Sequence, residues 1–133
     1  MSATPSPNVE RAIEHCRPED TQPVRLDAET LESTAPEYLR DLKQELTQAG
    51  YVPTVLDVRA SFAEDCSLET QREADRVRGL VRAASFLGVG TVSVHCETVA
   101  NPEKVRPALS ACAERAQREG LAFELDAPIT VDV

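Results

Sequence analysis

Apolar and polar residues alternate in four short segments of the chain, and this period of two is typical of β-strands with one buried face. The segments are residues 23–29 (PVRLDAE), 51–60 (YVPTVLDVRA), 91–95 (TVSVH) and 121–126 (LAFELD). In each segment one face is apolar, whereas the other is small or polar and becomes most polar toward its C-terminal end. Each predicted strand is therefore suited to packing under helices on one side only.

Longer segments in which apolar residues recur every three to four positions separate these strands and predict helices. Their apolar stripes are Leu39, Leu42, Leu46 and Ala49; Ala74, Val77, Leu80, Val81, Ala84 and Leu87; and Val105, Ala108, Leu109, Cys112 and Ala116. We expect the first helix to begin at the capping box Thr34-Ala35-Pro36-Glu37, the second at Ser67, and the third at Asn101-Pro102. A glycine marks the end of each helix, at Gly50, Gly88 and Gly120.

The expected order is four helix–strand units, the first helix being a short one capped by Asn8. Strands that alternate with helices form parallel sheets. An open doubly wound sheet is apolar on both faces, so the one-sided pattern favours a barrel, which has helices only outside. We predict an α/β fold, a partial TIM barrel of about four β/α units. It forms one domain at residues 9–133, after a flexible N-terminus at residues 1–8, and ITVDV after Pro128 adds a short edge strand.

The polar face of each predicted strand brings charged residues toward a common end of the sheet. These residues are Arg25, Asp27 and Glu29; Asp57 and Arg59; Ser93 and His95; and Glu124 and Asp126. A single polar strand end is most simply a solvated terminus. Four strands with the same polarity favour a shared barrel mouth, which is where α/β folds build their active sites.

Composition narrows the choice of partners. The 133 residues carry a formal net charge of −9, from 23 acidic and 14 basic residues, and only Lys43 and Lys104 are lysines. Passive binding of nucleic acid or anionic lipid needs basic surfaces, so neither partner is expected. An acidic, lysine-poor surface resembles that of a salt-adapted cytoplasmic protein. No C-x-x-C pair, signal peptide or membrane-length apolar run is present, so we expect free thiols and a cytoplasmic location.

The pattern resembles the xylose isomerase-like TIM-barrel superfamily, which includes sugar phosphate isomerases/epimerases and the endonuclease IV group. Residues 87–95 (LGVGTVSVH) are similar to a helix end followed by a strand that closes on histidine, seven residues after the first glycine. Residues 120–126 (GLAFELD) are similar to a strand that closes on a metal-binding glutamate, here an aspartate. Residues 38–58 resemble the preceding unit, and the resemblance covers residues 9–127.

This resemblance implies a divalent metal (Zn, Mn or Mg) held by His95 and Asp126, with Glu124 and Asp126 as the carboxylates that move a proton. It implies aldose–ketose isomerisation or epimerisation of a sugar or sugar phosphate. The residues that would bind the substrate are Arg25, Asp57 and Arg59. Two departures are that the chain has four strands where a full barrel has eight, and that Arg59, which cannot bind a metal, stands near a metal-binding histidine of endonuclease IV relatives.

Three hypotheses remain open from the sequence. The first is a metal-dependent isomerase or epimerase with an incomplete site. The second is a non-catalytic half-barrel that binds a metabolite or a protein, with a homodimer or a partner chain to cover its open edges. The third is an unrelated small α/β domain; neither a G-x-G-x-x-G nor a Walker sequence is present, so nucleotide binding has little support.

Overall fold

The chain folds into a parallel sheet with helices in the connections between its strands. The structure is a computed structural model that describes residues 22–131, so the helix predicted after Asn8 and the predicted N-terminal boundary lie outside the described residues. The strands lie side by side in the order of the sequence and are β1 (Gln22–Asp27), β2 (Tyr51–Arg59), β3 (Thr91–His95) and β4 (Ala122–Asp126). The connections contain α2 (Pro36–Gln48), α3 (Ser67–Leu87) and α4 (Pro102–Arg118), and the 3-10 turn η1 (Ala28–Thr30) follows β1. The predicted partial α/β barrel is confirmed.

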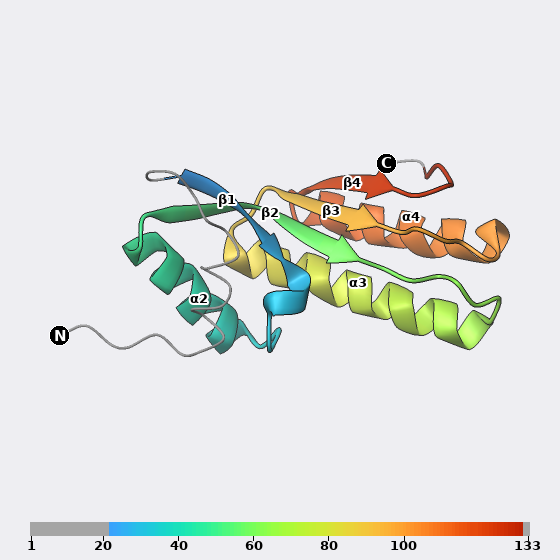
Figure 1. Cartoon of the computed structure of the whole chain (residues 1–133), viewed down its shortest axis with the longest axis horizontal. Coiled ribbons are helices and arrows are strands. Elements are labelled where there is room, and N and C mark those ends of the chain that lie inside the picture. Colours follow the sequence, from blue (N-terminus) through green and yellow to red (C-terminus); the bar gives the residue numbers. More distant parts are fainter. Residues whose placement is uncertain (1–21, 132–133) are drawn as a thin grey trace.

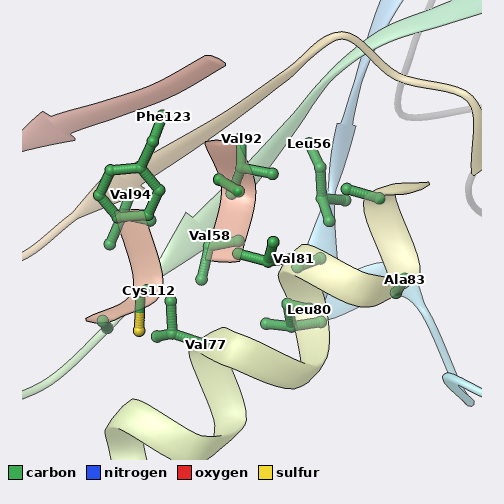
Figure 2. Packing of buried hydrophobic residues seen from close by; sticks show 14 of the residues in the cluster. Leu56, Val58, Val77, Leu80, Val81, Ala83, Val92, Val94, Cys112 and Phe123 are labelled. Carbon is green, nitrogen blue, oxygen red and sulfur yellow. The ribbon is translucent and has the colours of Figure 1, made fainter. Parts of the chain in front are cut away.

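The three helices lie on one side of the sheet, and no helix of the described chain covers the other side (Figure 1). The hydrophobic core fills the space between the sheet and the helices. Figure 2 shows Val77, Leu80 and Val81 of α3 near the apolar side chains of the central strands. The strand residues that share this core are Leu26, Leu56, Val58, Val92, Val94 and Phe123. The predicted apolar face of each strand is therefore the helix side, and the polar face is bare.

The helix ends follow the local sequence in most places. Asn101 caps α4, since its side chain accepts a hydrogen bond from the Glu103 amide, as expected for asparagine at this position. Gly88 ends α3 with a φ of 77°, a left-handed conformation that glycine adopts without strain. The capping box predicted at Thr34 is wrong. The residue that caps α2 is Ala35, whose side chain cannot accept a hydrogen bond, so Thr34 lies one residue too early.

Two predicted strand ends also need correction. The first strand stops at Asp27, because the Asp27 side chain accepts a hydrogen bond from the Glu29 amide and turns the chain into η1. Residues 129–131 form no strand, whereas residues 132–133 lie outside the described part of the chain. The segment after β4 instead runs toward α4, where Arg106 donates a hydrogen bond to the Thr130 carbonyl.

A bulge in β2 sets the register of the first two strands. Val24 pairs with Pro53 and Arg25 pairs with Val55, so Thr54 is an extra residue on β2. Beyond the bulge, Asp27 pairs with Asp57, and the remaining strands continue in regular register. No helix among residues 22–131 is long and apolar enough to cross a membrane.

Candidate functional site

The polar residues predicted at the strand ends form rows across the bare face of the sheet. In the last row Arg59 of β2 pairs with His95 of β3, and His95 pairs with Asp126 of β4. The row before it contains Asp57, Ser93 and Glu124. Register and alternation therefore bring the predicted residues of three strands together.

A broad depression of about 1520 Å³ lies over these strand ends. It is lined by Arg25, Asp27, Asp57, Arg59, Ala60, Ser61, Ala63, His95, Cys96, Glu97, Thr98, Asp126, Ala127 and Pro128. Glu124 is not among these residues, since it stands one row further from the carboxyl ends. Ser61, Glu97 and Thr98 were not predicted from the sequence as site residues. The one feature of the sequence that could have indicated them is that each lies within three residues of a strand end.

Four charged or titratable side chains, one from each strand, form a chain across the depression. Arg25 donates hydrogen bonds from Nε and Nη2 to the two carboxylate oxygens of Asp57, at 2.9 and 2.7 Å. Asp57 Oδ1 lies 3.6 Å from His95 Nε2, and His95 Nδ1 lies 3.4 Å from Asp126 Oδ2. The imidazole thus stands between two carboxylates, with the Ser93 hydroxyl 3.4 Å from its Nε2 atom.

The environment of Asp57 favours its charged form. Hydrogen bonding from Arg25 lowers the pKa of Asp57 below its ordinary value, and this outweighs the opposing effect of partial burial. The neighbouring His95 lowers the Asp57 pKa further. Asp126, at the other end, has a side chain that is 85% exposed and is open to a ligand from solvent.

Arg59 is the one arginine lining the depression whose side chain has no side-chain partner among residues 22–131. Its backbone is held by neighbouring groups, but its exposed guanidinium makes no hydrogen bond or ion pair within the described part of the chain. Arg25, by contrast, is already bound to Asp57. Of the two arginines predicted to bind substrate, Arg59 is therefore better placed to donate to a ligand.

Cys96 lines the depression beside His95, but its thiol is not poised as a nucleophile. Burial raises the pKa of the Cys96 thiol to about 11, and the negative charges of Glu73 and Asp126 add to this effect. The thiolate is the reactive form, so the protonated, buried Cys96 is a small packing residue at neutral pH.

The described residues do not provide the donor set of a resident metal ion. No group of three or more His, Cys, Asp and Glu residues among residues 22–131 is arranged to hold one. The Asp57 carboxylate lies beside Nε2 of His95, whereas the Asp126 carboxylate lies beside Nδ1. A metal ion bound to one of these ring nitrogens therefore cannot also bind both carboxylates. Both Asp57 oxygens also accept hydrogen bonds from Arg25. Protein metal sites of the zinc type use three or four converging ligands.

The loops around the depression are tied to each other. Phe62 and Val99 form a parallel bridge beyond the ends of β2 and β3, and the Ala100 amide donates to the Phe62 carbonyl at 2.9 Å. Asp65 accepts hydrogen bonds from Asn101 and Lys104, at 3.1 and 2.9 Å. These contacts join the loop after β2 to the start of α4, next to Ser61, Ala63 and Thr98, which line the depression.

The fold is that of part of a xylose isomerase-like TIM barrel. The structure is similar to a xylose isomerase domain protein from Planctomyces limnophilus, with a TM-score of 0.66 and 14% identity over 77% of this chain and 43% of that chain. It is also similar to the IolI protein solved with a bound zinc atom, with a TM-score of 0.56 and 18% identity over 90% of this chain and 45% of that chain. The chain thus spans less than half the length of either structure, and identities this low establish the fold alone.

Sequence comparison identifies the family. No curated protein sequence matches the chain. Residues 20–125, which include all the strands and helices described above except the last residue of β4, match the family described as Domain of unknown function (DUF8564). The chain belongs to this family.

Proposed function

We propose that the chain binds a small hydroxyl-rich anion, a sugar phosphate or a sugar acid, at the carboxyl ends of β2, β3 and β4. The observation that carries this proposal is the Arg59 guanidinium, which has no side-chain partner in residues 22–131 and stands in one row with His95 and Asp126. A guanidinium donates two parallel hydrogen bonds to phosphate or carboxylate oxygens. Proteins with α/β folds also generally bind their ligands at the carboxyl ends of the strands.

The other charges of the depression define what else the ligand carries. The depression is lined by four acidic residues and two arginines, namely Asp27, Asp57, Glu97 and Asp126 with Arg25 and Arg59. These carboxylates repel a bare dianion, but they accept hydrogen bonds from hydroxyl groups. A ligand with one anionic group for Arg59 and several hydroxyls for Asp126 and its neighbours matches this mixture. Inorganic phosphate has the anion but lacks the hydroxyls.

His95 and Asp126 are the residues proposed to move a proton if the bound sugar is isomerised or epimerised. The His95 side chain is 43% exposed, and its Nδ1 atom faces Asp126, so a neutral imidazole can take a proton while Asp126 stabilises the resulting cation. Glu124, the second predicted carboxylate, stands one row deeper and does not line the depression. Isomerisation needs proton removal and proton return, and His95 is the one imidazole of the described chain. Binding is therefore proposed as the primary function.

Metal-dependent isomerisation is the second candidate, because the similar IolI structure holds a zinc atom. The predicted metal ligands in this chain are His95 and Asp126, which is one ligand fewer than the three protein residues typical of catalytic zinc sites. Zinc, manganese and magnesium content of the purified protein tests this candidate. About one metal per chain that is lost in His95→Ala supports it, whereas a metal-free protein that still binds sugar phosphate removes it.

A second copy of the chain is the proposed partner for the bare face. The outer strands of the described sheet are β1 and β4, and each has one edge that no strand of residues 22–131 covers. Two copies related by a twofold axis place β1 of each copy beside β4 of the other, which covers both open edges. Light scattering in molar salt and in dilute buffer measures the mass. A dimer supports this arrangement, and a monomer in both buffers contradicts it.

Calorimetric titration with glucose 6-phosphate and gluconate tests the binding proposal. We expect both to bind more tightly than inorganic phosphate, and we expect Arg59→Gln to weaken each by about tenfold or more, since it removes a charge-assisted pair of hydrogen bonds. Arg72→Gln is the matched control, because Arg72 is an exposed arginine of α3 outside the depression. Equal affinities in the two variants would contradict the assignment of Arg59.

A further inference from the structure

Glu73 and Arg76 lie three residues apart on α3, a spacing typical of solvated ion pairs on a helix surface, but this pair makes a further set of contacts. Arg76 donates to Glu73 from Nε at 2.8 Å and from Nη2 at 3.1 Å. The same Nη2 atom also donates to the backbone carbonyl of Arg59. Glu73 Oε2 accepts a hydrogen bond from the Ser61 amide at 2.6 Å. The pair therefore binds the backbone on both sides of Ala60.

This end of β2 is held at three consecutive residues. The Arg59 carbonyl is bound by Arg76, the Ala60 amide donates to the His95 carbonyl at 2.9 Å, and the Ser61 amide is bound by Glu73. The contacts come from two directions, one from α3 and one from β3. Because Ala60 is buried toward the helices, the side chain of Arg59 is directed to the opposite, bare face.

The environment of Glu73 is consistent with a structural anion. Its side chain is only 18% exposed. Burial by itself opposes the charged form, but hydrogen bonds from Arg76 and from the Ser61 amide outweigh it, so the pKa of Glu73 lies below its ordinary value. A partly buried carboxylate with three donors around it stays in one place, whereas an exposed pair on a helix surface exchanges with water.

The next pair toward the start of α3 shows the contrast. Glu69 and Arg72 have the same spacing of three residues, with Arg72 Nη1 3.2 Å from Glu69 Oε1. Their side chains are more exposed, and within residues 22–131 neither donates to nor accepts from the backbone of β2. The same sequence pattern thus has two structural outcomes on one helix, and only Glu73 and Arg76 reach the strand end.

We infer that Glu73 and Arg76 are positioning residues for the proposed ligand site: they fix the backbone of residues 59–61 so that the Arg59 guanidinium is directed into the depression. The inference rests on the proposed function for its consequence in binding. Its structural part, a fixed backbone at residues 59–61, is independent of any ligand. Neither Glu73 nor Arg76 lines the depression, so each acts through Arg59 and not by touching the ligand.

Nuclear magnetic resonance of the ligand-free chain tests the structural part. In Glu73→Gln and Arg76→Gln we expect the Ser61 amide hydrogen to exchange with solvent about tenfold faster. The first variant removes the charged acceptor of this amide, and the second removes the arginine that holds the acceptor in place. We also expect the backbone N–H order parameters of Arg59 and Ala60 to fall. Arg72→Gln is the control and leaves both quantities at their wild-type values. If Arg76→Gln also leaves both unchanged, the positioning role is overturned.

Titration with glucose 6-phosphate tests the consequence for binding. We expect Glu73→Gln and Arg76→Gln to raise the Kd by about three- to tenfold, with Arg72→Gln unchanged. Arg76→Lys keeps the charge but lacks the planar fork, so it behaves like Arg76→Gln if geometry is the cause. Full rescue by Arg76→Lys, or unchanged affinity despite a disordered backbone at residues 59–61, overturns the inference. If the wild-type chain does not bind glucose 6-phosphate, the proposed function fails, and the backbone order parameters of Arg59 and Ala60 still decide whether the pair fixes this strand end.

Discussion

Arg25 on β1 and Asp57 on β2 form a two-bond ion pair, although the register does not place them opposite each other. Arg25 pairs with Val55, and its side chain reaches diagonally along the sheet to both oxygens of Asp57. The pair sets the charge pattern of the depression. It occupies both carboxylate oxygens of Asp57 and engages the Arg25 guanidinium, which leaves Arg59 as the arginine better placed to bind a ligand.

A double-mutant cycle measures the strength of this pair. We expect Arg25→Gln, Asp57→Asn and the double variant to give a coupling energy of about 1 kcal/mol, at the upper end for surface pairs, because two parallel bonds reach a carboxylate that is 27% exposed. The more exposed Glu69–Arg72 pair is the control, and we expect about 0.3 kcal/mol there. Equal coupling in the two cycles would contradict the two-bond geometry. Urea unfolding provides the free energies.

The lowered pKa of Asp57 predicts a dependence of stability on pH. A carboxyl whose folded pKa lies below its unfolded value stabilises the fold above the unfolded pKa, and the contribution is lost as the pH falls through the folded pKa. The ordinary value is 3.8, so the contribution is complete near neutral pH and declines below about pH 4. We expect the difference in unfolding free energy between wild type and Asp57→Asn to shrink over this acidic range. A difference that stays constant from pH 6 to about pH 2.5 would show that Asp57 is not stabilised as an anion.

Substitution by alanine is expected to affect stability differently at the starts of α2 and α4. Asn101→Ala removes the oxygen that accepts from the Glu103 amide and the amide group that donates to Asp65, so we expect a loss of about 1 kcal/mol or slightly more. Thr34→Ala removes no capping bond, because Ala35 occupies the cap position, and we expect a change within about 0.5 kcal/mol. Thermal and urea unfolding compare the two variants. A larger loss for Thr34→Ala would restore the capping box that the sequence predicts.

The core between sheet and helices is the main source of stability. Leu56 is fully buried in the middle of β2 and faces the helix layer. We expect Leu56→Ala to destabilise the chain by about 2–5 kcal/mol, since a cavity remains where the side chain was. Leu68→Ala is the matched control, because Leu68 of α3 is exposed, and a much smaller loss is expected there. Equal losses in the two variants would contradict a core between sheet and helices as the main source of stability.

Most of the fold follows from local patterns in the sequence. The period of two placed all four strands, and the period of three to four placed α2, α3 and α4. Alternation also predicted that His95 and Asp126 share a face with Arg59, and the register confirms it. These features depend on neighbours in the chain, and an apolar face must be buried whatever its partners are.

The pairing of charges could not be predicted in the same way. Alternation places Arg25 and Asp57 on one face, but the diagonal contact also depends on the bulge at Thr54, which leaves no clear mark in the sequence. The Glu73–Arg76 pair has the same spacing as the Glu69–Arg72 pair, and only the position of the β2 end distinguishes them. Which partners a long charged side chain finds is set by the tertiary structure. Arg25 was for this reason predicted as a ligand-binding residue without its partner.

The most direct test of the proposed site is a map of amide chemical shifts during titration with glucose 6-phosphate. We expect shifts that saturate with one Kd at residues 59–61, 95–98 and 126–127, from three separate strand ends, and loss of this response in Arg59→Gln. Inorganic phosphate alone should produce a weaker response at the same residues. An absence of shifts at these strand ends, or shifts confined to the exposed face of α3, would contradict a ligand site at the carboxyl ends of the strands.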